Sequence, residues 1–190
     1  MLRSDVKKIA ILFAREDSSY KNFDNFEVYD IKRDARTFCK KMPVIAHPPC
    51  RAWGMLSHMA NPREGEKQLA YLALAQVRLN GGILEHPHGS RLWKEAPLPD
   101  GGGQQDEFGG FTVEIDQWDF GHVAHKNTKL YICGIDPKDL PSLPPKKIGT
   151  PTRSICGNVK NTTRCTQYQR EYTPDDLIKW LTEICNKINY

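Results

Sequence analysis

The sequence predicts an α/β fold built on a mostly parallel central sheet. Short apolar runs of strand length recur along the chain, two of them end abruptly at prolines, and amphipathic helical segments alternate with them. A strand–helix–strand unit pairs its two strands in parallel, because the helix carries the chain back to the starting edge of the sheet. A chain of 190 residues suits one such domain.

The first three predicted strands lie at residues 8–14, 26–31 and 44–46. The first and third are continuous apolar runs, typical of strands buried on both faces, whereas the second alternates apolar and polar residues. Between the first two strands we expect a polar turn with a short helix beginning at Ser18. Residues 33–38 indicate a loop or a single helical turn.

The next segments predict a βαβ unit. Proline cannot donate to a sheet ladder, so Pro48 and its neighbour end the third strand and leave Cys50 at its carboxyl end. A helix is expected over residues 64–80, because apolar residues recur at helical spacing and a Gly-Gly pair stops it. The strand at 83–87 follows and carries Glu85 near its end. A right-handed crossover then brings both strand ends to one edge of the sheet.

The second half predicts loops around a strand pair. Residues 96–110 are rich in Pro, Gly and acidic residues, which indicates an exposed loop of high mobility. Residues 111–120 and 129–134 read as strands of an antiparallel, hairpin-like pair. Residues 137–151 are proline-rich and predict a stiff, extended connection.

The last predicted helix has Thr173 as its N-cap and Pro174 at its first position. Its apolar residues share one face. We therefore expect a single domain over the whole chain, with an antiparallel terminal strand and long surface loops at 95–110 and 135–170.

Composition limits the class of protein. No apolar run approaches membrane-spanning length, and residues 1–5 lack the apolar core of a signal peptide, so we expect a cytoplasmic protein without a membrane partner. The six cysteines are scattered and form no Cys-x-x-Cys pair. Free thiols in a reducing compartment are therefore expected, and no metal site.

Charge is unevenly distributed although the net charge is only +4. Residues 95–119 contain seven acidic residues and no Lys or Arg, whereas residues 137–170 contain seven Lys or Arg and one acid. The basic segment is suited to phosphate contact, and the alternative is a solvated loop. We expect the acidic segment to face away from a bound nucleic acid or to act as a gate.

Several short motifs, in the same order, resemble the cytosine-5 DNA methyltransferase family. They are Leu-Phe-Ala at 12–14, Pro-Pro-Cys at 48–50, the strand-end Glu85, the strand at 129–134 and Arg-Glu-Tyr-Thr-Pro at 170–174. The resemblance covers most of the chain. It implies an abbreviated, Rossmann-like methyltransferase fold, S-adenosylmethionine as cofactor, and DNA or a cytosine nucleotide as substrate.

The resemblance also implies catalytic roles. Cys50 would be the nucleophile that adds to carbon 6 of cytosine, and Glu85 would share a proton with ring nitrogen 3. We expect Arg51 to help lower the pKa of the thiol. The alternatives are a small hydrophobic Cys in a rigid turn and a solvated carboxylate at a strand end. Trp53 would either stack on a base or belong to the core.

By the same resemblance, the cofactor would contact Phe13, Ala14, Asp17, Asp30 and Pro48. Asp30 would hold a ribose hydroxyl, as an acid at the end of a second strand does in nucleotide-binding folds. The family's loop is Phe-x-Gly-x-Gly, and this chain has no glycine there, so close backbone approach to a cofactor is less favoured.

Nucleic-acid contacts are assigned to basic side chains of the second half. They are Lys126, Lys129, Lys146, Lys147, Arg153, Lys160 and Arg164. Residues 134–153 leave no room for the target-recognition domain of the family, so base-specific reading is expected to be slight. The alternative function is a catalytically inactive module that binds a nucleotide or nucleic acid in a regulatory or host-interfering role.

Overall fold

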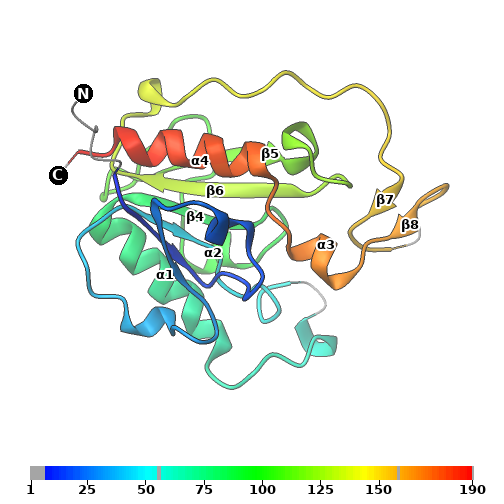
Figure 1. The fold of residues 1–190 in the computed structure, drawn as a ribbon, viewed down its shortest axis with the longest axis horizontal. Coiled ribbons are helices and arrows are strands. Elements are labelled where there is room, and N and C mark those ends of the chain that lie inside the picture. The colour runs from blue at the N-terminus through cyan, green and yellow to red at the C-terminus, as the bar shows by residue number, and fades with distance from the viewer. Residues whose placement is uncertain (1–6, 55–56, 158, 190) are drawn as a thin grey trace.

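A six-stranded mixed sheet of order β2-β1-β3-β4-β6-β5 forms the centre of the protein (Figure 1). The computed structural model describes residues 7–54, 57–157 and 159–189. The strands are β1 (Ile9–Leu12), β2 (Phe26–Tyr29), β3 (Val44–Ala46), β4 (Gly82–Pro87), β5 (Phe111–Asp116) and β6 (Asn127–Cys133). Strands β1 to β4 are parallel, and β6 runs antiparallel to both β4 and β5. The expected mostly parallel α/β sheet is confirmed. The antiparallel strand, expected to be terminal, is β6, which lies between β4 and the edge strand β5.

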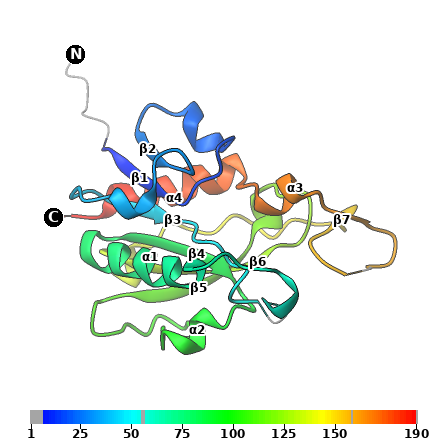
Figure 2. The same cartoon turned by 90° about the horizontal axis from the view of Figure 1, so that it is seen from below.

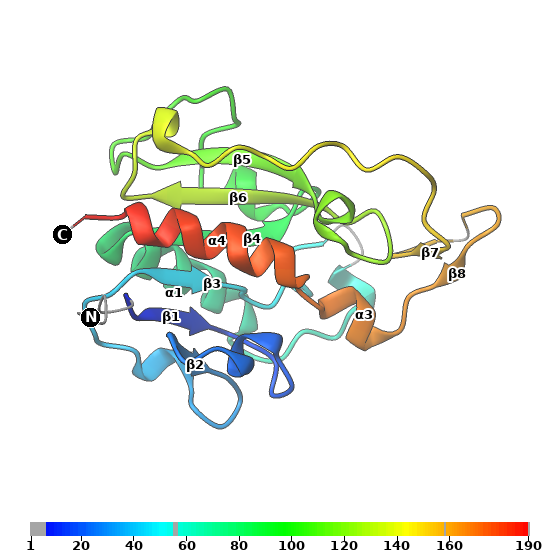
Figure 3. The ribbon, with the colours of Figure 1, turned by 45° about the horizontal axis from the view of Figure 1, so that its top comes forward.

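Two longer helices cover opposite faces of the sheet (Figures 2 and 3). The α-helices are α1 (Glu66–Asn80), α2 (Leu92–Glu95), α3 (Gln167–Glu171) and α4 (Asp175–Lys187). Short 3-10 turns are η1 (Ser19–Asn22), η2 (Ala35–Thr37), η3 (Ser57–Met59), η4 (Gln117–Phe120) and η5 (Pro137–Asp139). A separate two-stranded sheet pairs β7 (Arg153–Ser154) with β8 (Thr163–Arg164). None of the helices in these described ranges is long and apolar enough to cross a bilayer.

The alternation of side chains along each strand creates two cores. In β1, Ala10 and Leu12 pack with α1, whereas Ile9 and Ile11 pack with α4. The same alternation places Leu84 of β4 on the α1 side and its neighbour Ile83 on the α4 side. By this period of two, Glu85 is directed to the α4 face and His86 to the α1 face.

The predicted βαβ unit is confirmed, because β3 and β4 are adjacent parallel strands joined through α1. Ile45 pairs with Ile83 and Ala46 with Leu84. At Gly82 a Cβ atom would lie 1.9 Å from the carbonyl oxygen of Val44, so only glycine permits this close pairing. The carboxyl ends of the two strands consequently meet at one edge.

The second half differs from expectation at element ends. The predicted hairpin-like pair is confirmed, but β5 ends at Asp116, whose carboxylate accepts a hydrogen bond from the backbone N–H of Trp118 and starts η4. Helix α4 has Pro174 rather than Thr173 as its N-cap. The acidic loop at 96–110 is anchored at Asp106, whose carboxylate accepts hydrogen bonds from Tyr131 and Arg78.

Candidate active site at the carboxyl edge of the sheet

The site lies at the edge where the parallel strands end. Strand β1 pairs with β2 on one side and β3 on the other, so the chain leaves β1 in one direction and β3 in the opposite one. In open α/β sheets such a switch point forms the crevice that receives ligands. Phe13, the first residue after β1, has a φ of 63°. A bulky side chain in this left-handed region is strained, and such strain is found at functional sites.

Cys50 is exposed and lies in the loop that follows β3, after His47, Pro48 and Pro49. Enough protein surrounds its thiol that desolvation, together with the Glu85 carboxylate, raises the pKa, while the Lys126 ammonium acts in the opposite direction. The expectation that Arg51 helps to lower this pKa stays a prediction: Arg51 and Cys50 interact electrostatically, but Arg51 is not among the main causes of the shift at Cys50. Arg51 forms an ion pair with the buried carboxylate of Glu66, its Nε lying 3.0 Å from Oε1.

Glu85 is held by hydrogen-bond donors on both oxygens. Its Oε2 lies 2.9 Å from His47 Nδ1, and its Oε1 accepts from Gln117 Nε2 at 3.0 Å. Burial alone would raise the pKa of this carboxyl, but Lys126 and His47 outweigh it and lower the pKa to about 2. Glu85 is therefore ionised at neutral pH.

A hydrogen-bonded chain extends from Glu85 to the buried Tyr20 of η1. The Tyr20 hydroxyl lies 3.0 Å from His47 Nε2. An ionised carboxylate only accepts, so the Nδ1–H of His47 donates to Glu85, while Nε2 on the other side of the ring is hydrogen-bonded to the Tyr20 hydroxyl. Gln117 Nε2 also contacts Thr128 Oγ1 at 3.0 Å. The network thus ties the ends of η1, β3, β4 and η4 together.

Sequence reasoning missed Tyr20, His47 and Gln117 as members of the site. One signal was present for His47, because it lies two residues after Ile45 and therefore on the α4 face, as Glu85 does. Tyr20 and Gln117 follow from no spacing rule, since each reaches the site from a short turn in a different part of the chain.

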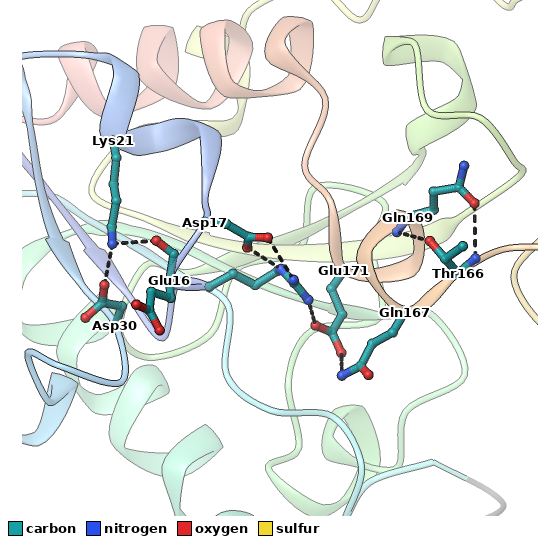
Figure 4. Close-up of polar contacts among 9 residues, drawn as sticks. Glu16, Asp17, Lys21, Asp30, Thr166, Gln167, Gln169 and Glu171 are labelled. Carbon is teal, nitrogen blue, oxygen red and sulfur yellow. Dashed lines mark hydrogen bonds and ion pairs between the residues drawn. The ribbon is translucent and has the colours of Figure 1, made fainter.

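The side chains expected to hold a cofactor are already paired with protein groups (Figure 4). The Asp30 carboxylate accepts from the backbone N–H of Lys32 at 2.8 Å and forms an ion pair with Lys21. These contacts lower the pKa of Asp30 to about 2, the Lys21 hydrogen bond being the largest cause. Asp17 is paired with Arg15, whose Nε lies 2.8 Å from Oδ1.

Arg15 also forms an ion pair with Glu171 of α3, so the loop after β1 is bridged to the C-terminal part of the chain. Phe13, Ala14 and Pro48 lie at the same strand ends. As arranged, this glycine-free loop with a self-paired set of charges does not fit S-adenosylmethionine, because Asp30 and Arg15 would first have to exchange partners.

Helix α3 lies beyond the carboxyl ends of β1 and β3 (Figure 3). A capping box at Thr166 and Gln169 begins it, and the His122 Nε2 lies 2.7 Å from the carbonyl oxygen of Gln169. Glu171 is close enough to act on the pKa values of both Cys50 and Arg51. The Arg-Glu-Tyr-Thr-Pro motif, noted only for its resemblance, therefore contributes a charge to the site.

The basic residues assigned to nucleic acid have different surroundings. Lys126 joins the site, where it acts on Cys50 and Glu85. Lys129 is buried and paired with Asp100 at 2.7 Å and with Glu114 at 3.2 Å. Such pairing leaves Lys129 no free charge for a phosphate.

The basic and acidic segments contact each other, and the expected position of the acidic segment relative to a nucleic acid stays a prediction. Lys146 Nζ lies 2.8 Å from Asp119 Oδ2. The ammonium of Lys147 lies 3.9 Å from the ring centroid of Trp118. Within the described ranges no ion pair involves the three remaining cations, which are Arg153, Lys160 and Arg164.

Trp53 is fully buried, which settles its open assignment in favour of the core. It packs beside His86, at 6.4 Å between ring centroids, and burial lowers the pKa of His86 to about 4. The part of the chain that the structure describes contains no group of three His, Cys, Asp or Glu side chains able to hold a metal ion.

Comparisons of the chain with protein-family models, with curated proteins and with solved structures find no match. The assignment of function therefore depends on the geometry of this edge: a thiol, an ionised carboxylate and an ammonium at the ends of β3, β4 and the turn before β6.

Proposed function

We propose that the protein modifies carbon 5 of cytosine, in DNA or in a cytosine nucleotide, through a covalent adduct of Cys50. One observation carries the proposal: Cys50, in the loop after β3, and Glu85, near the end of the neighbouring parallel strand β4, lie at one edge of the sheet, and the Glu85 carboxylate raises the pKa of the Cys50 thiol. The antiparallel β6 beside β4 supports an abbreviated methyltransferase-like fold for the same chain.

The chemistry assigns a role to each group. The Cys50 thiolate forms a bond to carbon 6, and the electrons of the 5,6 double bond move to carbon 5, which then takes up an electrophile. Loss of the original proton from carbon 5 to water expels the thiolate and restores the ring. Addition makes ring nitrogen 3 basic, so this nitrogen takes up a proton from water, and ionised Glu85 accepts hydrogen bonds from that N–H and from the exocyclic amino group. Lys126 favours the thiolate.

The source of the electrophile is not assigned to S-adenosylmethionine, because the loop after β1 does not fit it as arranged. A solvent proton is the simplest electrophile. The adduct then exchanges the hydrogen on carbon 5 with water, a reaction that needs no donor.

That exchange tests the proposal. A single-stranded oligonucleotide labelled with tritium at carbon 5 of one cytosine should release tritium to water in the presence of the protein. Cys50→Ala should abolish release, and Glu85→Gln should reduce it. Lys179→Gln, which changes an exposed ion pair on α4, serves as control. Release that persists in Cys50→Ala, or no release by a wild-type protein that binds the oligonucleotide, would contradict the proposal.

A second candidate is a binding module without catalysis. The self-paired charges of the first loop favour it, since Arg15, Asp17 and Asp30 are satisfied without a ligand. Calorimetry with S-adenosylmethionine and with a cytosine nucleotide separates the candidates. Nucleotide binding without tritium release supports the module.

A further inference from the structure

A cavity of about 430 Å³ lies beside the loop that carries Cys50. Its lining residues come from the loop between β3 and α1 and from the first turn of α1; they are Ala52, Ser57, His58, Pro62, Arg63, Gly65, Lys67 and Gln68. The first lining residue in the sequence, Ala52, lies two positions after Cys50. Because α1 follows β3, the cavity belongs to the same carboxyl edge as the candidate active site.

Most of the lining surface is apolar, and its ionisable side chains are those of His58, Arg63 and Lys67. Arg63 is exposed, and no other described residue forms an ion pair with it. Lys67 is shared between Glu95, at 2.6 Å, and the ring of Trp53, at 4.8 Å.

A further cation, Arg91, contacts two of the lining residues. The Arg91 guanidinium donates hydrogen bonds to the carbonyl oxygen of Ala52 and to Ser57 Oγ, both at 3.0 Å. The buried acid Glu66 is paired with Arg51, and Lys67 is paired with Glu95. The unpaired guanidinium of Arg63, the Ser57 hydroxyl and the Gln68 amide therefore provide the lining with hydrogen-bond donors that suit phosphate oxygens.

We propose that this cavity binds a phosphate group carried by the pyrimidine whose base reaches Cys50. This inference rests on the proposed function. It adds a binding site for the phosphate of the substrate, which the proposed function does not specify. A volume of about 430 Å³ accommodates a sugar phosphate. Arg63 provides the free charge, in contrast to Lys129 and Lys146, whose charges are paired with acids of this chain. The phosphate belongs to a free nucleotide or to a strand.

Charge removal at Arg63 tests the proposal. Binding of dCMP and of a ten-nucleotide single strand with one cytosine is measured at several KCl concentrations for wild type, Arg63→Gln and Lys138→Gln. Lys138 is the matched control, an exposed lysine paired with Asp136. Arg63→Gln should weaken strand binding roughly 3- to 10-fold and reduce the salt slope by about 0.7, the value for one phosphate contact on single strands. The control should bind as wild type does.

The two ligands identify the source of the phosphate. If Arg63→Gln loses affinity for dCMP, the cavity binds the phosphate of the cytosine nucleotide itself. If it loses affinity only for the strand, the cavity binds the phosphate of a flanking nucleotide. Unchanged affinity and salt slope for both ligands, with circular dichroism showing a folded variant, would overturn the proposal, as would a wild-type protein that binds neither.

Tritium release separates this proposal from the proposed function. If Arg63→Gln weakens binding while the wild type releases no tritium, the phosphate site stands and the cytosine chemistry fails. If the wild type releases tritium and Arg63→Gln does so with an unchanged KM, the chemistry stands and the phosphate site fails.

Discussion

At the scale of single residues, the thiol of Cys50 is governed by two opposite charges. The Glu85 carboxylate raises its pKa and the Lys126 ammonium lowers it. Glu85→Gln removes the repulsion with little change in shape and should accelerate alkylation of Cys50 by iodoacetamide at neutral pH. Lys126→Gln should slow it. Peptide mass spectrometry measures the rate at Cys50, with the exposed Cys39 and Cys156 as internal controls.

Equal rates at Cys50 in wild type, Glu85→Gln and Lys126→Gln would contradict this electrostatic coupling. A change of the same size at Cys39 would indicate a general effect on the protein rather than on the site.

His47 is the residue that connects Glu85 to Tyr20. His47→Ala removes a donor from a buried carboxylate and should cost about 1–3 kcal/mol of the free energy of unfolding, because a buried acceptor loses its partner. Tyr20→Phe removes one hydroxyl and should cost about 0.5–1.5 kcal/mol. Urea denaturation at neutral pH measures both. Two variants as stable as the wild type would show that the chain of hydrogen bonds contributes nothing.

Cys50 and Glu85 could be predicted from sequence because prolines and strand lengths place both at strand ends. Their partners could not. Tyr20 and His47 are separated by 27 positions, and Gln117 reaches Glu85 from 32 positions away. Such contacts follow from the packing of η1 and η4 against the sheet edge, which no local pattern encodes.

At the scale of elements, the Arg15–Glu171 ion pair connects α3 to the loop after β1. The Arg15–Glu171 pair is partly exposed, at 30% and 46% of the two side chains, so it is worth at most about 1 kcal/mol. Glu171→Gln should therefore leave global stability nearly unchanged. It should increase hydrogen exchange in the segment around α3, because the loop after β1 no longer retains it.

The matched control for this prediction is Lys179→Gln, which breaks an exposed pair with Asp176 on α4. Faster exchange around α3 in both variants, or in neither, would contradict a retaining role for Glu171.

Sequence patterns located most elements and two of their pairings, β3 with β4 and β5 with β6. The apolar runs gave β1, β3 and β4 within a few residues, because buried parallel strands need continuous apolar side chains. The contact between the basic and acidic segments, made by Lys146 and Asp119, could not be predicted, because the two residues are far apart in the sequence and no local pattern encodes their pairing.

At the scale of the whole molecule, pH should change stability through His86. Burial lowers its pKa to about 4 from an ordinary value of 6.5. Between these two pH values His86 is protonated in the unfolded chain but not in the folded protein. Stability should fall as pH decreases from 6.5 to 4, by about 3 kcal/mol at 1.36 kcal/mol per pKa unit. Burial also lowers the pKa of His122, which adds loss of the same sign.

The carboxyls of Glu85 and Asp30 act in a lower window. Their pKa values of about 2 are depressed from 4.5 and 3.8, so their contribution is lost only as pH falls below those ordinary values. Urea denaturation from pH 4 to pH 7 isolates the histidine effect. His86→Gln should flatten the dependence whatever its stability at pH 7, and an unchanged slope would contradict the assignment.

The central claim is that Cys50 attacks carbon 6 of a pyrimidine. An oligonucleotide carrying 2-pyrimidinone tests it most directly, because this base lacks the exocyclic amino group and is more electrophilic at carbon 6. After acid quenching, peptide mass spectrometry should find the oligonucleotide attached to Cys50 and to neither Cys39 nor Cys156, the other exposed cysteines. Unmodified Cys50 in a protein that binds the oligonucleotide, or attachment at Cys39 or Cys156, would contradict the claim.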